Sequence, residues 1–175
     1  MYNKVILGLI LCEILASIHF ILNLATYQQH NQIGYYSSYL CQVDGFIACF
    51  IFYMIMLYNY QLSHAIQTMY DEFNPAKVKA ADYHLTAVIL ALILSAITIP
   101  LKDIGRSPFD SCGIMMGSLS QYLFAFVAIL VLIYCIYSLL RIARILMNDK
   151  TILKRLREDM HYHIMNVVMY IVVWF

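Results

Sequence analysis

Charged residues are sparse along the chain, and the stretches between them are long and apolar. Glu13 is the only charged residue between positions 5 and 43. Four further stretches carry no charge at all, namely residues 45–70, 83–101, 111–140 and 160–175. A hydrocarbon core about 30 Å thick needs a helix of about 20 predominantly apolar residues. The pattern therefore predicts five transmembrane helices, at about residues 5–26, 41–66, 84–101, 119–143 and 161–175.

The apolar stretches are continuous and do not alternate. Residues 88–94 read Val-Ile-Leu-Ala-Leu-Ile-Leu, whereas the strands of a membrane barrel alternate over about ten residues. Backbone groups in lipid must be hydrogen-bonded within the protein, which favours helices. We therefore expect an all-α integral membrane fold, in which residues 1–175 form a single helical bundle.

Composition agrees with this expectation. Apolar residues make up 63% of the chain and charged residues 12%, against about 45–50% and about 25% in soluble domains. Eleven basic and ten acidic residues give a formal net charge of +1, so no strongly basic surface is available for a polyanion. These values argue against a soluble enzyme, a disordered tail and a nucleic-acid-binding protein. The expected partner is the lipid bilayer.

Basic residues are divided unequally between the connecting segments. Cytoplasmic loops carry an excess of Lys and Arg. With the N-terminus inside, only Lys102 and Arg106 fall outside. The other nine fall on the cytoplasmic side: Lys4, Lys77, Lys79, Arg141, Arg144, Lys150, Lys154, Arg155 and Arg157. We expect a cytoplasmic N-terminus, outer segments 27–40 and 102–118, and a plasma-membrane location.

The five cysteines fall into two groups. Cys12, Cys49 and Cys135 lie within predicted spans, where a free thiol behaves as a small apolar group. Cys41 opens the second span at its outer end, and Cys112 lies in the second outer segment. Disulfides persist outside the plasma membrane, so we predict a Cys41–Cys112 bridge across the mouth of the bundle. The alternative is two unpaired thiols.

Three polar residues at membrane depth are candidate functional groups. Glu13 lies about midway through the first span, where a charge costs about 2.5–3.5 kcal/mol on insertion scales. We expect it to face the bundle interior. Asp44 lies one turn inside the second span, either as a cation or polar-ligand contact or as an interfacial carboxylate in water. Asn59 is a further candidate for a buried polar contact between helices.

The fourth connecting segment is the most basic part of the chain. Between residues 139 and 160, apolar positions follow approximately helical spacing and basic residues fill the rest. One interpretation is a cytosolic coupling surface, and the other is a juxtamembrane helix whose basic residues meet anionic lipid. The candidate coupling residues are Arg141, Arg144, Lys154, Arg155 and Arg157.

No motif indicates an enzyme. The chain contains no His-Glu-x-x-His, no Gly-rich phosphate loop and no Gly-x-Ser-x-Gly. We predict no cofactor and no metal site. Tyrosines cluster near the ends of the spans, among them Tyr39, Tyr83 and Tyr122. We interpret them as an interfacial belt.

The order of these features resembles a G-protein-coupled receptor of the seven-helix class, in the cyclic-AMP-receptor-like branch and its secretin-like neighbours. The stretch around Glu13 resembles that family's second helix. Residues 41–46 resemble the start of the third helix, and residues 97–101 the outer end of the fourth. Residues 110–114 look like the second outer loop with its bridging Cys, and residues 165–175 are similar to the sixth helix. Ala65-Ile66-Gln67 stands where rhodopsin-like receptors have Asp-Arg-Tyr, a triplet that the cyclic-AMP-receptor-like branch also lacks.

Two functional hypotheses follow. The resemblance implies an incomplete seven-helix receptor bundle, either a fragment of a longer receptor or a remnant with another role. On this hypothesis a ligand at the outer mouth shifts the inner helix ends, and a heterotrimeric G protein reads that motion. The expected ligand-binding residues are Asp44, Phe46, Ala48 and Cys49. The alternative is a non-catalytic, lipid-embedded accessory subunit of a larger complex, with other membrane subunits as partners.

Overall fold

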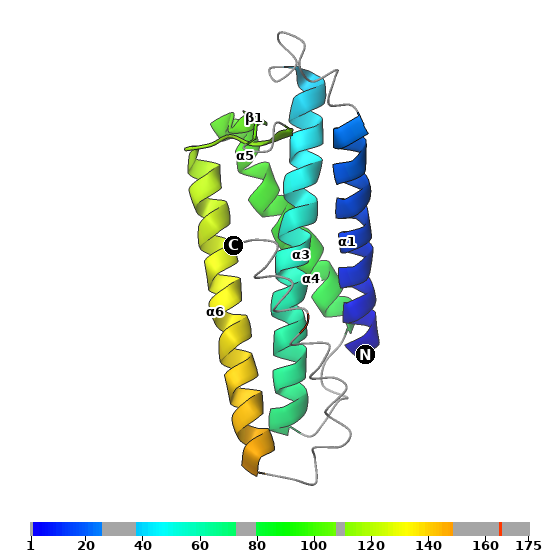
Figure 1. Ribbon diagram of the computed structural model, residues 1–175, viewed down its shortest axis with the longest axis vertical. Helices are drawn as coiled ribbons and strands as arrows, with labels where there is room; N and C mark the ends of the chain where they lie inside the picture. The colour runs from blue at the N-terminus through cyan, green and yellow to red at the C-terminus, as the bar shows by residue number, and fades with distance from the viewer. Residues whose placement is uncertain (1, 26–37, 73–79, 108–110, 149–164, 166–175) are drawn as a thin grey trace.

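The computed structural model describes residues 2–25, 38–72, 80–107 and 111–148, together with residue 165 (Figure 1). The long helices in these ranges are α1 (Tyr2–Ala25), α3 (Tyr39–Glu72), α4 (Ala80–Ala96) and α6 (Leu119–Asn148). Between α4 and α6 lie a one-turn helix, α5 (Thr98–Leu101), and two short antiparallel strands, β1 (Ile104–Arg106) and β2 (Cys112–Ile114).

The long helices run alternately up and down, so their termini gather at two ends (Figure 1). The hairpin end, defined by β1 and β2, also holds the start of α3 and the start of α6. The basic end, defined by Lys4, Arg141 and Arg144, holds the start of α1 and the end of α6. Alternation of this kind follows from short connections between antiparallel neighbours.

Within the described residues, four helical segments are long and apolar enough to cross a membrane. They are Lys4–Asn23, Tyr39–Thr68, Tyr83–Leu101 and Leu119–Arg144. The prediction of a helical fold with apolar helices of membrane-spanning length is confirmed for these four segments. The fifth predicted span, 161–175, lies outside the described residues except for Met165.

The helix boundaries differ from the predicted spans. Helix α6 extends past residue 143 to Asn148, and α4 begins at Ala80 instead of residue 84. Helix α3 extends past residue 66 to Glu72, because hydrogen bonding along a helix continues beyond the hydrocarbon layer. The span predicted at 84–101 is divided, with α4 ending at Ala96 and α5 beginning at Thr98. Pro100 explains the division. A proline has no N–H to donate, and its ring clashes with the carbonyl four residues earlier, which here belongs to Ala96.

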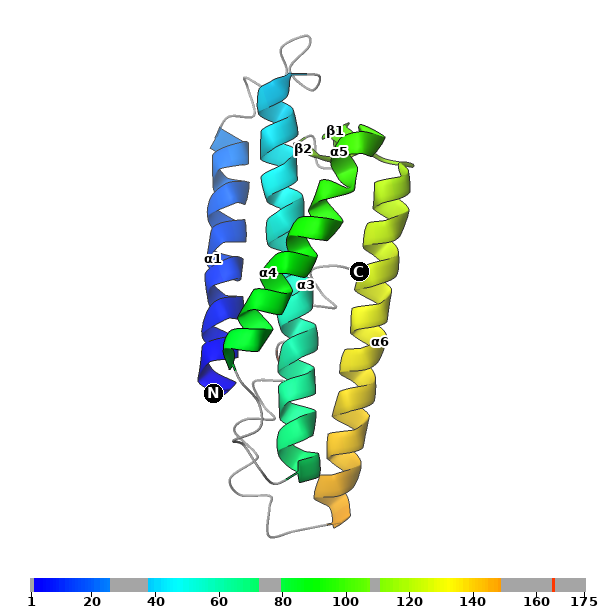
Figure 2. The ribbon, with the colours of Figure 1, turned by 180° about the vertical axis from the view of Figure 1, so that it is seen from behind.

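Helix α3 forms the centre of the bundle. It contacts α1, α4, α6 and both strands, and the two opposite views show the other helices around it (Figures 1 and 2). Its side chains Tyr53, Met56 and Leu62 are fully buried. Residues of α1, α4 and α6 complete one hydrophobic cluster with them. The described helices therefore share one core.

The close approach of α1 to α3 depends on Gly8. A Cβ at this position would lie 2.8 Å from the Tyr58 ring, closer than real Cβ contacts. A side chain at this position would have to displace the Tyr58 ring. Tyr58 is held in place on its other side, because its hydroxyl group bonds His84 Nδ1 of α4 at 2.8 Å.

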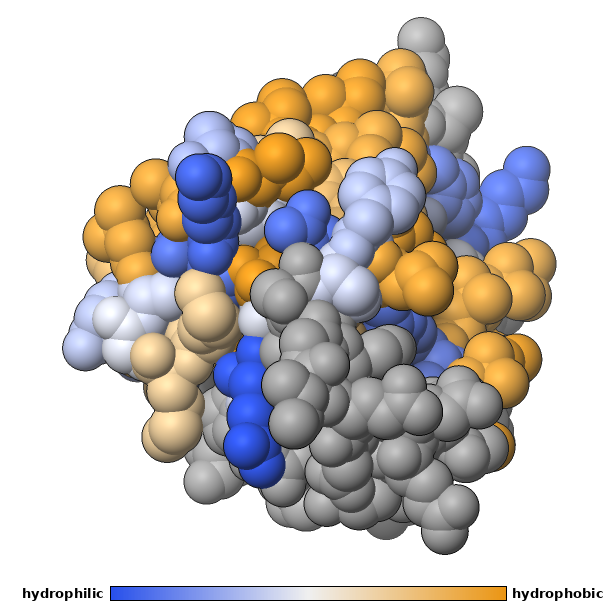
Figure 3. Space-filling model, turned by 90° about the horizontal axis from the view of Figure 1, so that it is seen from above, coloured by the Kyte–Doolittle hydropathy of each residue, from blue (hydrophilic) through white to orange (hydrophobic). Residues whose placement is uncertain are grey.

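Polar side chains are found inside the bundle, and large apolar side chains are found on its surface. Small and polar side chains are buried between the helices, as is usual for helix contacts in membranes: Asn59, Gln61, Ser63, Ser95, Thr98, Ser120 and Ser138. Large apolar side chains face outward along α1, α4 and α6, including Leu7, Ile14, Phe20, Ile93, Phe126 and Ile133. Figure 3, seen from the hairpin end, shows hydrophobic areas at the periphery. Such a surface suits lipid.

Candidate functional site

The Cys41–Cys112 disulfide organises the hairpin end. The two Cα atoms lie 5.3 Å apart, and the bond joins positions 71 residues apart in sequence, so this sequence prediction is confirmed. Cys41 lies in the first turn of α3, where its N–H donates to Ser38 Oγ at 3.2 Å. A serine oxygen immediately before a helix satisfies one of the free N–H groups there. The disulfide thus ties the hairpin to a capped helix start.

The hairpin packs directly on α3. Ile104 pairs with Ile114, and Arg106 pairs with Cys112. A Cβ added to Gly45 would overlap the Ile104 side chain and lie 3.1 Å from Gly113 N. A glycine at position 45 is therefore required for the hairpin to sit this close to the helix.

Asp103 joins the hairpin to the start of α6. Its carboxylate Oδ2 accepts a bond from Ser120 N at 2.9 Å, and its main-chain oxygen accepts one from Met115 N at 2.9 Å. A carboxylate at a helix N-terminus is favoured by the unpaired N–H groups and the helix dipole. The hairpin is therefore fixed both to α3 and to α6.

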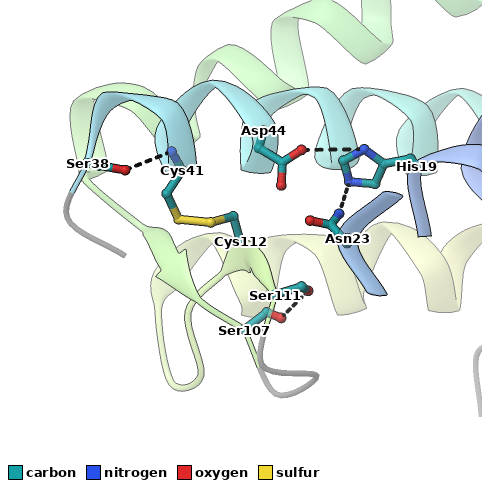
Figure 4. Close-up of a disulfide and its surroundings, with 8 residues drawn as sticks. All are labelled: His19, Asn23, Ser38, Cys41, Asp44, Ser107, Ser111 and Cys112. Carbon is teal, nitrogen blue, oxygen red and sulfur yellow. Dashed lines mark hydrogen bonds and ion pairs between the residues drawn. A yellow bond between two sulfur atoms is a disulfide. The ribbon is translucent and has the colours of Figure 1, made fainter. Parts of the chain in front are cut away.

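A polar cluster lies beside the disulfide, between α1 and α3 (Figure 4). His19 Nδ1 lies 3.6 Å from Asp44 Oδ1, and His19 Nε2 lies 2.8 Å from Asn23 Nδ2. If Asn23 donates to Nε2, the ring proton sits on Nδ1 and faces the carboxylate. Asp44 Oδ2 is buried and has no hydrogen-bond partner among the described residues. The cluster therefore offers one free carboxylate oxygen at the hairpin end.

Sequence reasoning identified Asp44 but missed His19 and Asn23. Their depth along the predicted spans was the sequence signal that could have identified them. His19 lies near the outer end of the first predicted span and Asp44 near the outer end of the second, so both occupy the same level of the bundle.

The other predicted ligand-binding residues are spread around α3. Ala48 is four residues after Asp44 and therefore on the same face, and it is buried. Phe46 is half-buried, and it is two residues from Asp44 and so points to a different side of the helix. Cys49 is a free, buried thiol. The structure thus groups Asp44 with Ala48 and places Phe46 apart from them.

The prediction for Glu13 is wrong in the part of the chain that the structure describes. Its side chain is exposed, not turned into the bundle. The buried face of α1 is set by Val5, Leu9 and Cys12, spaced three to four residues apart. Glu13 follows Cys12 directly and therefore lies about 100° farther round the helix.

The predicted burial of Asn59 is confirmed, since its exposed fraction is 5%. Its side chain nevertheless bonds within its own helix, donating to Ile55 O at 2.9 Å. The main-chain oxygen of Asn59 accepts a bond from Cys135 Sγ of α6 at 3.8 Å, and its neighbours make further bonds between helices. Ser138 Oγ of α6 donates to Ser63 O at 3.1 Å, and His64 Nδ1 lies 2.9 Å from the Tyr83 hydroxyl of α4.

Tyrosines in the half of the bundle toward the basic end form further links. Tyr134 of α6 donates to Gln67 Oε1 at 3.2 Å, and its ring lies 4.6 Å from that of Tyr60. Tyr83 bonds His64 and is half-buried, in contrast to the exposed Tyr122. Tyr83, interpreted as part of an interfacial belt, therefore links α3 and α4.

The predicted coupling residues are described only in part. Arg141 and Arg144 are exposed at the basic end, on α6. Lys154, Arg155 and Arg157 lie outside the described residues.

No protein-family model matches the chain, and no curated protein matches its sequence.

Proposed function

We propose that this chain is the core of a membrane receptor of the G-protein-coupled class, with α1, α3, α4 and α6 in the places of its second to fifth helices. The observation that carries the proposal is the Cys41–Cys112 bond, which ties the segment after α4 and α5 to the start of the central helix. The sequence resemblance places a bridging cysteine at these two points. A bundle that only anchored another subunit has no evident need for a fixed hairpin over one end.

The hairpin end is the proposed ligand side. A free carboxylate oxygen on Asp44, close to His19, suits a ligand that carries a positive charge or a hydrogen-bond donor. Such a ligand would bridge α1 and α3. Because the hairpin is fixed to α3 and α6, we expect ligand binding to displace the helices and not the hairpin. The links among Tyr134, Gln67 and Tyr60 would transmit that displacement between α6 and α3.

The basic end is the proposed cytosolic side. In the sequence, nine of the eleven basic residues fall in the segments predicted to be cytoplasmic, which is the distribution that cytoplasmic segments favour. Arg144 is exposed there and available to a partner. A heterotrimeric G protein in its nucleotide-free state is the proposed partner.

Nucleotide-sensitive co-purification tests the proposal. The tagged protein would be recovered from its native membranes after nucleotide removal with apyrase, with or without a non-hydrolysable GTP analogue. We expect a Gα subunit to co-purify only without the analogue. Arg144→Gln should reduce its recovery, whereas Lys102→Gln, which removes the same charge from the hairpin end, should not.

The alternative, a non-catalytic accessory subunit, has one observation in its favour. Glu13 is exposed at membrane depth, as expected where another helix covers it. On that alternative, membrane proteins co-purify in fixed ratio regardless of nucleotide, and no Gα subunit is recovered. That result would contradict the receptor proposal.

A further inference from the structure

The Glu13 side of α1 combines two properties that do not suit lipid. Glu13 is the tenth residue of the twenty in the span Lys4–Asn23, so it lies near mid-membrane depth. Its side chain is exposed, and no described residue forms a hydrogen bond or ion pair with its carboxyl group. Ser17, one turn later, is also exposed. Its hydroxyl group donates to the main-chain oxygen of Glu13 at 2.8 Å and not to the Glu13 carboxyl group.

Ionisable residues within membrane spans almost always face a bundle interior or pair with another polar group. The rest of the outward surface of α1 follows the lipid pattern. Its exposed side chains include Leu7, Leu11, Leu15 and Ile18. Glu13 and Ser17 share one face, since they are four residues apart. Between Val5 and Leu22 the exposed polar side chains are therefore confined to a single stripe, formed by Glu13 and Ser17, which we call the Glu13 stripe.

We propose that the Glu13 stripe is the contact surface for a transmembrane helix other than those of residues 1–175, which presents a hydrogen-bond donor or a basic side chain to the carboxyl group. Charge complementarity identifies this occupant. A carboxyl group requires a donor in the absence of water, and an interhelical hydrogen bond is the form that such a donor takes in a bilayer. The proposal does not depend on the receptor function.

Site-specific photocrosslinking tests the proposal. A benzophenone amino acid replaces Ser17 on the stripe, or Leu15 as a control, since Leu15 is exposed on the opposite flank of α1. The full chain is irradiated in its native membranes, and the adducts are identified by mass spectrometry. We expect the Ser17 probe to capture a transmembrane peptide that contains a donor residue, and the Leu15 probe to capture mainly phospholipid.

Variants of Glu13 connect the adduct to the carboxyl group. Glu13→Leu should lower the yield of the Ser17 adduct about three- to tenfold, and Glu13→Gln, which keeps hydrogen-bonding capacity, should preserve most of it. Formation of the Cys41–Cys112 disulfide, measured by thiol labelling, shows that each variant is folded. Adducts with lipid alone, adducts with a peptide from residues 1–175, or an undiminished yield in the Glu13→Leu variant would overturn the proposal. Each of these results leaves the G-protein test unaffected.

Discussion

At the scale of single residues, contacts between helices depend on small or polar side chains more than on large apolar ones. Gly8 is the clearest case, because it leaves room for the Tyr58 ring. Tyr58 in turn bonds His84, so one missing side chain on α1 permits a contact between α3 and α4.

Gly8→Leu should destabilise the protein by about 1–3 kcal/mol, because the added side chain overlaps Tyr58 in a packed interface. This loss opposes a gain of about 0.5–1 kcal/mol in helix propensity. Thermal unfolding in detergent measures the difference, and Leu7→Ala at a neighbouring exposed position should have little effect. If Gly8→Leu raised the melting temperature, α1 would not pack on α3 as described.

Tyr83→Phe should lower stability by about 0.5–1.5 kcal/mol, because it removes one interhelical hydrogen bond to His64. Tyr122→Phe makes the same chemical change at an exposed position and serves as the matched control. The two variants are compared in one thermal unfolding series. Equal effects would show that the His64–Tyr83 bond contributes nothing.

Residue orientation was the part of the site that sequence predicted least well. In water, polar residues mark the outer face of a helix. In lipid the outer face is also apolar, so periodicity along α1 carries little information about which side is packed. Glu13, predicted to face the bundle interior, is exposed among the described residues. Asp44 was identified because a lone carboxylate at a span end is visible in sequence, whereas His19 becomes significant only when α1 and α3 are placed side by side.

At the scale of elements, the spans were predictable because membrane thickness and the scarcity of charge together fix helix length. The break between α4 and α5 was not predicted, although Pro100 was the signal for it. The β1–β2 hairpin was also missed. Its strands have three residues each, too few to show the alternation by which a strand is recognised.

Loss of the disulfide should detach the hairpin from α3 and destabilise the folded state. Closing a loop of 71 residues contributes about 4 kcal/mol in the chain-entropy description. Cys41→Ser, Cys112→Ser and the double variant should therefore be destabilised to the same extent. Unequal effects would mean that one cysteine acts outside the bond.

Thiol counting checks the bond itself. In denatured, unreduced protein, an alkylating reagent should modify three cysteines, Cys12, Cys49 and Cys135. After reduction it should modify all five. Five modified cysteines before reduction would show that Cys41 and Cys112 are not joined.

At the scale of the whole molecule, the two ends of the bundle differ in chemistry. The hairpin end has a disulfide and a histidine–carboxylate pair, and the basic end has Lys4, Arg141 and Arg144. The proposed receptor function requires the hairpin end to face outward and the basic end to face the cytosol. Orientation is therefore the claim on which both the ligand side and the coupling side depend.

The most direct measurement is labelling of introduced cysteines in intact cells with a membrane-impermeant maleimide. Met116→Cys reports on the hairpin end and Arg144→Cys on the basic end, since both positions are exposed. The three free cysteines are buried and give little background. The account predicts that the cysteine introduced at position 116 is labelled in intact cells and that the one introduced at position 144 is labelled only after permeabilisation. Labelling of position 144 from outside, with position 116 protected, would contradict it.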